Sequence, residues 1–189
     1  MKLAEYLTNS FYYEGIISDE DKEIVRFGLE SMMGNLLSIA LTLVVGIYFK
    51  CIRDALLLWP FLFLLRKNAG GYHAETKTRC LFISAVMLVV TFALFTMFDY
   101  SAVFYGVCVF VTGYSIWIWT PVDNPSKELD EVEHNVYRMR SRIILLVEGT
   151  IFTLALYFKW KTMMSSVAMA FFIVSVSLLM GRYKVHRKK

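Results

Sequence analysis

The chain lacks the short motifs that mark several large enzyme classes. Its 3 His include no HExxH pair, its 3 Cys form no CxxC pair, and no GxSxG sequence is present. These absences argue against a zinc peptidase, a zinc-binding or disulfide framework, and a serine hydrolase with a nucleophile elbow. We expect neither a metal ion nor another cofactor.

Polar and charged residues are also scarce. Of the 189 residues, 57% are hydrophobic and 16% are aromatic, which is above the usual share in a soluble domain. The apolar residues lie in long runs, which predicts a single all-α integral membrane domain over residues 1–189. The first 30 residues lack the apolar core of a signal peptide, so we expect the spans themselves to drive insertion.

Six apolar segments predict about six short transmembrane helices. They cover residues 32–49, 52–65, 81–98, 102–119, 143–158 and 163–180. Most are about 16 to 18 residues long, at the lower limit for a hydrocarbon core of about 30 Å. Segment 52–65 contains Pro60 and reaches only roughly 21 Å as a helix, so it must thin the bilayer, snorkel its flanks or be re-entrant.

The N-terminal segment, residues 1–17, has an amphipathic pattern. Leu3, Tyr6, Leu7 and Phe11 recur at helical spacing. The pattern predicts a helix that lies on the membrane surface or packs on the cytoplasmic face of the protein itself.

The distribution of positive charge predicts the topology. If all six segments span and the N-terminus is inside, 16 of the 20 Lys and Arg residues fall on the inner side. Only Lys50, Arg53, Lys159 and Lys161 then lie outside, which is the bias of the positive-inside rule. We therefore expect both termini and the loop 66–80 to be cytoplasmic. The net charge of +4 follows from this topology, and no nucleic-acid partner is expected.

The polar loop 66–80 holds the best candidates for chemistry. Cys80 stands where a span begins, and the positive end of the helix dipole, with Lys77 and Arg79 nearby, favours the reactive thiolate. His73 offers a matching base, and an inert interfacial cysteine is the alternative. Residues seven apart on a straight helix are separated by about 10.5 Å along its axis, so a working pair requires the chain between them to depart from one helix.

Gly70 and Gly71, just before His73, give the loop the freedom to fold back. Their backbone N–H groups could also face a developing oxyanion, with a simple turn as the plainer interpretation. A third group that would orient the imidazole is not identified, and three candidates stay open: Asn68, Glu75 and Glu148.

Three segments together resemble a known family. They are Arg66-x-x-Ala69-Gly70-Gly71-x-His73-Ala74 followed by Cys80, then Phe27-Gly28-x-Glu30, and Thr120-Pro121-Val122-Asp123-Asn124. In spacing, length and span layout the chain is similar, over essentially its full extent, to the AgrB family. Members of this family are bacterial membrane endopeptidases of accessory-gene-regulator quorum sensing. The resemblance implies a multi-pass protein of the bacterial cytoplasmic membrane.

The resemblance also implies a reaction. AgrB proteins cut a membrane-bound propeptide of the AgrD type and hold its N-terminal part as a thioester on a cysteine. A Cys or Ser within that peptide then closes a thiolactone or lactone ring. By this likeness Cys80 is the nucleophile and His73 the general base and acid. The family likeness, the short spans, and glycines at candidate packing faces also imply a homodimer. Those glycines are Gly34, Gly46, Gly106 and Gly113.

Several charged residues are candidates for propeptide binding. Arg66 and Lys67 suit carboxylates, or anchor the topology, and Glu30 either has a role in the family or pairs with Arg26 on its own helix. The family's proline loop is often followed by a basic cluster, whereas here Lys127 precedes acidic residues. The candidates for binding an acidic propeptide tail are then the later arginines, Arg138, Arg140 and Arg142.

Glu148, inside a predicted span, should face the bundle or water and pair with an arginine. Two other functions compete with the peptidase. A small non-enzymatic transporter component should gather polar ligand groups on the outer side, where the predicted loops are nearly featureless. A peptide exporter without protease activity is the second alternative.

Overall fold

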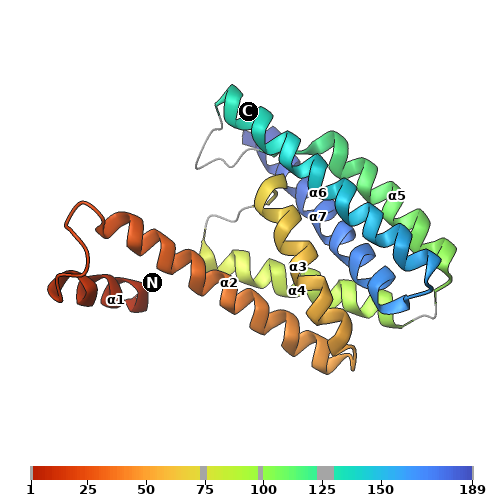
Figure 1. Cartoon of the computed structure of the whole chain (residues 1–189), viewed down its shortest axis with the longest axis horizontal. Helices are drawn as coiled ribbons and strands as arrows, with labels where there is room; N and C mark the ends of the chain where they lie inside the picture. The colour runs from red at the N-terminus through yellow and green to blue at the C-terminus, as the bar shows by residue number, and fades with distance from the viewer. Residues whose placement is uncertain (1, 73–75, 98–99, 123–129, 189) are drawn as a thin grey trace. The chain divides into compact units, whose positions relative to one another are not determined.

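The computed structural model describes residues 2–72, 76–97, 100–122 and 130–188. Within these ranges the protein is helical, apart from connecting segments and one isolated β-bridge, so the all-α prediction is confirmed (Figure 1). The helices are α1 (Lys2–Tyr13), α2 (Lys22–Tyr48), α3 (Ile52–Ala69), α4 (Lys77–Thr96), α5 (Ala102–Trp119), α6 (Glu131–Tyr157) and α7 (Lys161–Lys188).

The chain divides into two compact units, Met1–Leu41 and Thr42–Lys189, with the boundary inside α2. In the first unit, residues 2–13 form the predicted N-terminal helix, α1. Its apolar residues Leu3 and Tyr6 are exposed, as a helix on a membrane surface requires.

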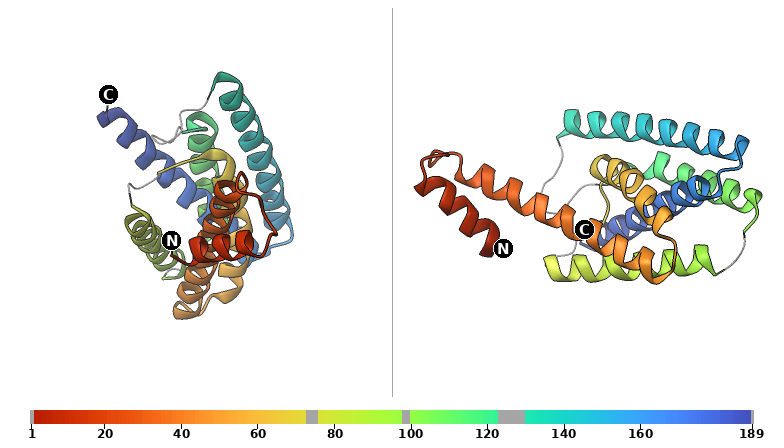
Figure 2. Two further views of the ribbon diagram at one scale, coloured as in Figure 1. Left: turned by 90° about the vertical axis from the view of Figure 1, so that its left-hand side faces the viewer. Right: turned by 60° about the horizontal axis from the view of Figure 1, so that its bottom comes forward.

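Helix α7 is the centre of the second unit. Its apolar residues, including Val167, Phe171, Val174 and Leu178, are buried, and it contacts α3, α4, α5 and α6. Figure 2 shows α7, in blue, running between α3 and α5. By contrast, α4 and α5 leave large apolar side chains such as Phe82 and Phe110 exposed. A helix whose apolar surface is not covered by protein suits contact with lipid.

Four described helices are long and apolar enough to cross a membrane: Lys22–Tyr48, Thr78–Thr96, Ala102–Trp119 and Lys161–Lys184. They coincide with four of the six predicted spans, and the chain is a multi-pass membrane protein. The other two predicted spans lie in α3 and α6, where Arg53, Asp54 and Glu148 interrupt the apolar sequence. The count of six spans therefore stays a prediction.

The helices of the second unit alternate in direction. Gly70, after α3, forms a parallel bridge with Val122, after α5, and Gly181 of α7 lies against Gly71. The C-terminal ends of α3, α5 and α7 therefore meet at one end of the bundle, while α4 and α6 run the other way. Cys80, in the first turn of α4, lies at that same end. The charge pattern predicts the same grouping of loops, and the side of the membrane that this end faces stays a prediction.

Candidate functional site

Cys80 lies in the first turn of α4, as the sequence predicts. Thr76 is the N-cap of this helix, and its Oγ1 accepts a hydrogen bond from the backbone N of Arg79 at 3.3 Å. The backbone N of Cys80 donates to the carbonyl oxygen of Thr76 at 3.0 Å. Threonine favours this cap position because its hydroxyl satisfies an otherwise unbonded N–H group. The capped turn places the half-buried thiol of Cys80 at the positive end of the helix dipole.

His73 lies outside the described residues, as do its neighbours Ala74 and Glu75. The described chain reaches Tyr72 on one side and resumes at Thr76 on the other. Helix α3 ends at Ala69 and α4 begins at Lys77, so no described helix contains the positions of both His73 and Cys80.

Gly70 and Gly71 lead from α3 into the loop, with φ angles of +74° and +137°. The backbone N of Val122 donates to the carbonyl oxygen of Ala69 at 3.2 Å, which holds this connection against the segment after α5. A Cβ atom on Gly70 would lie 2.5 Å from the carbonyl oxygen of Val122. Both the backbone conformation and the close approach therefore require glycine at position 70.

The segment after α5 braces the glycine connection. Thr120, Pro121 and Val122 are all buried, and Thr120 Oγ1 donates to the carbonyl oxygen of Ile116 in the last turn of α5. Asp123, Asn124 and Lys127 lie outside the described residues. The fold thus brings together two of the sequence features that carry the family resemblance, although the bridged residues Gly70 and Val122 are 52 positions apart in the sequence.

Tyr72, the residue before His73, is held on both sides of its backbone. Its N–H donates to Ser177 Oγ of α7 at 3.1 Å, and its carbonyl oxygen accepts from Arg66 Nη2 at 3.4 Å. The ammonium of Lys184 lies 5.4 Å from the centre of the Tyr72 ring. The backbone that leads into His73 is therefore fixed by α3 and α7 together.

Arg66 also lies close enough to Cys80 for their charges to interact. Burial lowers the pKa of the Arg66 guanidinium, and a thiolate on Cys80 opposes that shift because it stabilises the cation. One side chain therefore bonds the carbonyl before His73 and interacts electrostatically with Cys80. The sequence marked Arg66 as a binder of propeptide carboxylates or a topology anchor, because no local pattern reports a contact across the loop.

Comparison with known proteins identifies the family of the chain. The family model described as Accessory gene regulator B matches residues 1–178. The chain belongs to the AgrB family. This membership supports a role in accessory-gene-regulator quorum sensing and agrees with the apolar helices in placing the protein in a membrane.

Two similar AgrB relatives come from Clostridium perfringens. They are an AgrB-like protein of strain SM101 / Type A and AgrB-like protein 2 of strain 13 / Type A. Each is 28% identical to this chain over 145 residues, which is 73% of the chain and 65% of the relative. The chain therefore matches less than two thirds of the length of these relatives. No solved structure gives a significant match.

The remaining charged candidates lie on α2, α3 and α6. Glu30 accepts an ion pair from Arg26 Nε at 3.6 Å on the surface of α2, in the first unit. Lys67 is exposed on α3, and Arg140 is exposed on α6. Arg142, also on α6, places its guanidinium 4.5 Å from the centre of the Trp117 ring. Arg138 is half-buried on the same helix.

Glu148 is buried in the bundle, with 1% of its surface exposed, as expected for a carboxyl in a span. The expected arginine partner is not found among the described residues. Neither carboxylate oxygen of Glu148 has a hydrogen-bond partner there, and the buried Nε of Arg142 has none either. The two residues are six positions apart on α6, or about 9 Å along the axis, which is too far for a direct pair.

The other two cysteines lie away from the loop 66–80. Cys108 is in α5, and Cys51 directly precedes α3, where its thiol donates to the carbonyl oxygen of Phe49 at 3.2 Å. Burial raises the pKa of the Cys51 thiol, and the nearby Asp54 carboxylate raises it further. A raised pKa leaves less thiolate at neutral pH, which agrees with the passive role expected from the sequence.

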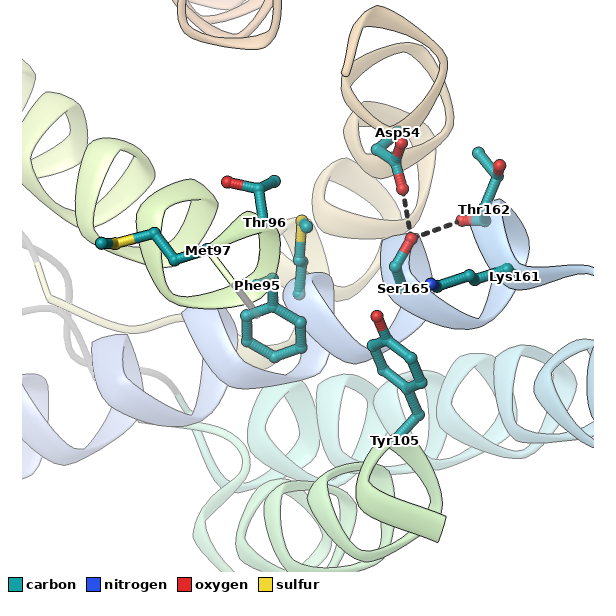
Figure 3. A pocket seen from close by; sticks show the side chains of 9 residues that line it. Asp54, Phe95, Thr96, Met97, Tyr105, Lys161, Thr162 and Ser165 are labelled. Carbon is teal, nitrogen blue, oxygen red and sulfur yellow. Dashed lines mark hydrogen bonds between the residues drawn. The ribbon is translucent and has the colours of Figure 1, made fainter. Parts of the chain in front are cut away.

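A cavity of about 570 Å³ lies at the opposite end of the bundle from Cys80. Figure 3 shows the side chains that line it, among them Asp54 of α3, Tyr105 of α5, and Lys161 and Ser165 of α7. Ser165 Oγ donates to the Asp54 carboxylate or to the carbonyl oxygen of Thr162. This polar cavity was not found in the sequence, because it depends on three helix starts meeting in space.

Proposed function

We propose that this AgrB-family protein is a membrane cysteine endopeptidase that cleaves an AgrD-type propeptide. In this proposal it also retains the acyl group for ring closure. The observation that carries the proposal is the placement of Cys80 in a capped first turn beside Arg66, which also holds the carbonyl before His73. A nucleophile, its base and a cation are then provided within one loop and the two helices that flank it.

The reaction divides into two transfers that need no external energy source. The Cys80 thiolate attacks the scissile carbonyl carbon, and the resulting oxyanion collapses with breakage of the C–N bond. The leaving amine takes a proton from the His73 imidazolium, which leaves a thioester on Cys80. An internal thiol or hydroxyl of the peptide then gives its proton to His73 and attacks the thioester. Cys80 leaves as a thiolate, and the ring is a thiolactone or a lactone.

Arg66 supports both transfers in this proposal. Its guanidinium stabilises the thiolate before attack and again when the sulfur leaves. Its hydrogen bond to the carbonyl of Tyr72 keeps the loop backbone beside the same cation. A water-poor setting would protect the thioester from hydrolysis, and the buried segment Thr120–Val122 behind the loop contributes to that protection.

The propeptide tail has a smaller set of candidate contacts than the sequence suggested. Lys67 and Arg140 are exposed and suit acidic side chains in water. Arg142 already stacks on Trp117, and Glu30 already pairs with Arg26. We therefore assign the first contacts with an acidic tail to Lys67 and Arg140. Arg138 takes a lesser part, and Gly70 and Gly71 shape the loop.

The orientation and oligomeric state are also part of the proposal. Both termini and the loop 66–80 face the cytoplasm of a bacterial cell, as the bias of positive charge requires. The functional unit is a homodimer. Gly46 and Gly113 pack within the chain, against Ala55 and Phe171. The open space around Gly34 and Gly106 leaves those two glycines for contact between helices of two copies.

The direct test replaces the two proposed catalytic residues and follows propeptide cleavage. We expect Cys80→Ala and His73→Ala each to abolish release of the C-terminal fragment of a tagged AgrD-type propeptide in membranes. Loss of a nucleophile removes several kcal/mol of barrier reduction, and each 1.36 kcal/mol is about tenfold in rate. Cys80→Ser should be nearly inactive because an alkoxide forms much less readily than a thiolate.

Cys51→Ala and Cys108→Ala are the matched controls for this test. Each removes one thiol elsewhere in the same fold, and each should retain most of the activity. Immunoblots of the membrane fraction show whether every variant is inserted. Release of the fragment by Cys80→Ala would show that the peptidase proposal is wrong.

A second candidate function is passage of the peptide through the bundle. The cavity at the opposite end from Cys80 supplies the polar groups that the predicted loops on that side did not offer. Asp54→Asn, which removes the carboxylate but keeps the shape, should reduce peptide in the medium and leave cleavage in the membrane unchanged. Equal amounts of peptide in the medium for Asp54→Asn and for the natural protein would show that the cavity is not on the transport path.

A further inference from the structure

Ser177 of α7 contacts the loop directly beside the position of His73. We propose that Ser177 is a positioning residue for His73, and that α7 is the surface on which the catalytic loop is set. This inference rests on the proposed peptidase function and adds a residue that the sequence marks only as one of many serines in an apolar helix.

The contact joins parts of the chain that are 105 positions apart. Ser177 is 1% exposed, and its Oγ accepts the backbone N–H of Tyr72 at 3.1 Å. Loss of this part-buried bond would leave the N–H group without its partner, which is costly. The next residue after Tyr72 is His73, so the bond fixes the backbone one residue before the imidazole.

Close packing on α7 supports the hydrogen bond. A Cβ atom on Gly71 would lie 2.6 Å from Ser177 Oγ. A Cβ atom on Gly181, one turn further along α7, would lie 3.0 Å from the carbonyl carbon of Gly71. The backbone at Gly71 therefore rests directly on the helix between Ser177 and Gly181, without a side chain between them.

The other side of the loop is held by Arg66. Because Arg66 bonds the carbonyl of Tyr72 and Ser177 bonds its N–H, rotation on both sides of the Tyr72 Cα is restricted. Arg66 also interacts electrostatically with Cys80. The two hydrogen bonds together hold the backbone before His73 at Arg66, the residue that interacts with Cys80. A displacement of about 1 Å between reacting groups can cost about 100-fold in rate, so this restriction matters for turnover.

The test compares Ser177→Ala with Ser166→Ala in the full-length protein reconstituted in liposomes with a synthetic AgrD-type propeptide. Ser166 is a suitable control because it is buried in the same helix and bonds the carbonyl oxygens of Asp54 and Thr162 at the far end. We expect Ser177→Ala to lower kcat about 10- to 100-fold with KM nearly unchanged. Ser166→Ala should leave both constants within about twofold, and Ser177→Thr, which keeps the hydroxyl, should recover much of the lost kcat.

A second measurement reports on the loop without using activity. Hydrogen exchange at the Tyr72 amide should accelerate in Ser177→Ala and stay slow in Ser166→Ala. Full kcat in Ser177→Ala, equal losses in both serine variants, or no recovery by Ser177→Thr would overturn the positioning role. Cys80→Ala is assayed beside them. If it is inactive while Ser177→Ala is fully active, only the positioning inference fails, whereas cleavage by Cys80→Ala would remove the peptidase function itself.

Discussion

The guanidinium of Arg66 makes two different interactions at the loop 66–80. It bonds the Tyr72 carbonyl and interacts with the charge on Cys80. Arginine suits the combination because its planar group carries five donors and a delocalised charge, whereas lysine presents a compact ammonium on a flexible stem. Charge and hydrogen-bond geometry can therefore be separated by substitution at this position.

We expect Arg66→Gln to reduce propeptide cleavage about 10- to 100-fold, since hydrogen bonds to charged groups contribute about 1.5 to 3 kcal/mol. The cleavage rate of Arg66→Lys should lie between those of this variant and the natural protein, because lysine keeps the charge but lacks the planar array of donors. Alkylation of Cys80 near pH 7, followed by mass spectrometry in a Cys51→Ala, Cys108→Ala background, should slow in Arg66→Gln. Lys67→Gln removes the same charge one position later and should leave the alkylation rate unchanged. Equal alkylation rates in Arg66→Gln and Lys67→Gln would contradict the assignment.

The local chemistry of the site was largely predictable from the sequence, and its tertiary contacts were not. A cysteine after threonine and basic residues at the start of an apolar run indicates a thiol at a helix N-terminus. Two adjacent glycines likewise indicate a bend. Ser177 carries no such pattern, because a serine in an apolar helix is most often a packing residue. Its role depends on a partner 105 positions away, which only the folded chain brings near.

Helix α7 determines how the other elements of the second unit are arranged. It contacts α3, α4, α5 and α6, and its C-terminal part supports the connection that follows α3. That connection is also bonded to the segment after α5 through Gly70 and Val122. Gly70 and Gly71 together are thus where α3, α7 and the segment after α5 meet, and a side chain at Gly70 would have to displace backbone atoms.

Gly70→Ala should separate the loop from the Val122 segment. The φ of +74° and ψ of −147° at Gly70 lie where only glycine is stable, and strain of this kind costs about 1 to 3 kcal/mol. We expect lower thermal stability in detergent and loss of propeptide cleavage. Gly149→Ala is the control, because α6 leaves its Cβ position free of neighbouring atoms. That change should be neutral or slightly stabilising. Normal cleavage by Gly70→Ala would show that the bridge to Val122 is dispensable.

At the scale of the whole molecule, the two ends of the bundle differ in chemistry. The loop 66–80, the Val122 segment and the C-terminal part of α7 share one end, and the cavity with Asp54 and Lys161 occupies the other. The sequence predicted this division through its charge bias, without the cavity. The number of spans was harder to predict, because charged residues within α3 and α6 make hydropathy ambiguous.

The orientation predicts which cysteines an impermeant maleimide can reach in intact cells. Cys80 in a Cys51→Ala, Cys108→Ala background should stay unlabelled until the cells are permeabilised. Ser101→Cys in a cysteine-free background is the control, because Ser101 is exposed at the start of α5, at the predicted outer end. It should be labelled without permeabilisation. Labelling of Cys80 in intact cells would show that the topology is inverted or that segment 52–65 does not span the membrane.

The homodimer predicts a mass of two chains for the protein in lipid nanodiscs. Gly106→Leu should weaken association, because it fills open space on α5 that a second helix would approach. Gly149→Leu, which also faces open space but is not assigned to the interface, is the matched control. A single-chain mass at every concentration would exclude the dimer.

The bond between Tyr72 and Ser177 has a consequence for the life of the newly made chain. Synthesis delivers the loop with Cys80 to the membrane about 100 residues before Ser177 leaves the ribosome. Translation proceeds at about 5 to 20 residues per second, so Cys80 is present for several seconds before Ser177 has been synthesised. A ribosome-bound or prematurely terminated chain therefore contains Cys80 without the helix that contacts its loop. By the proposed role of Ser177, we expect full propeptide cleavage only after α7 has been inserted.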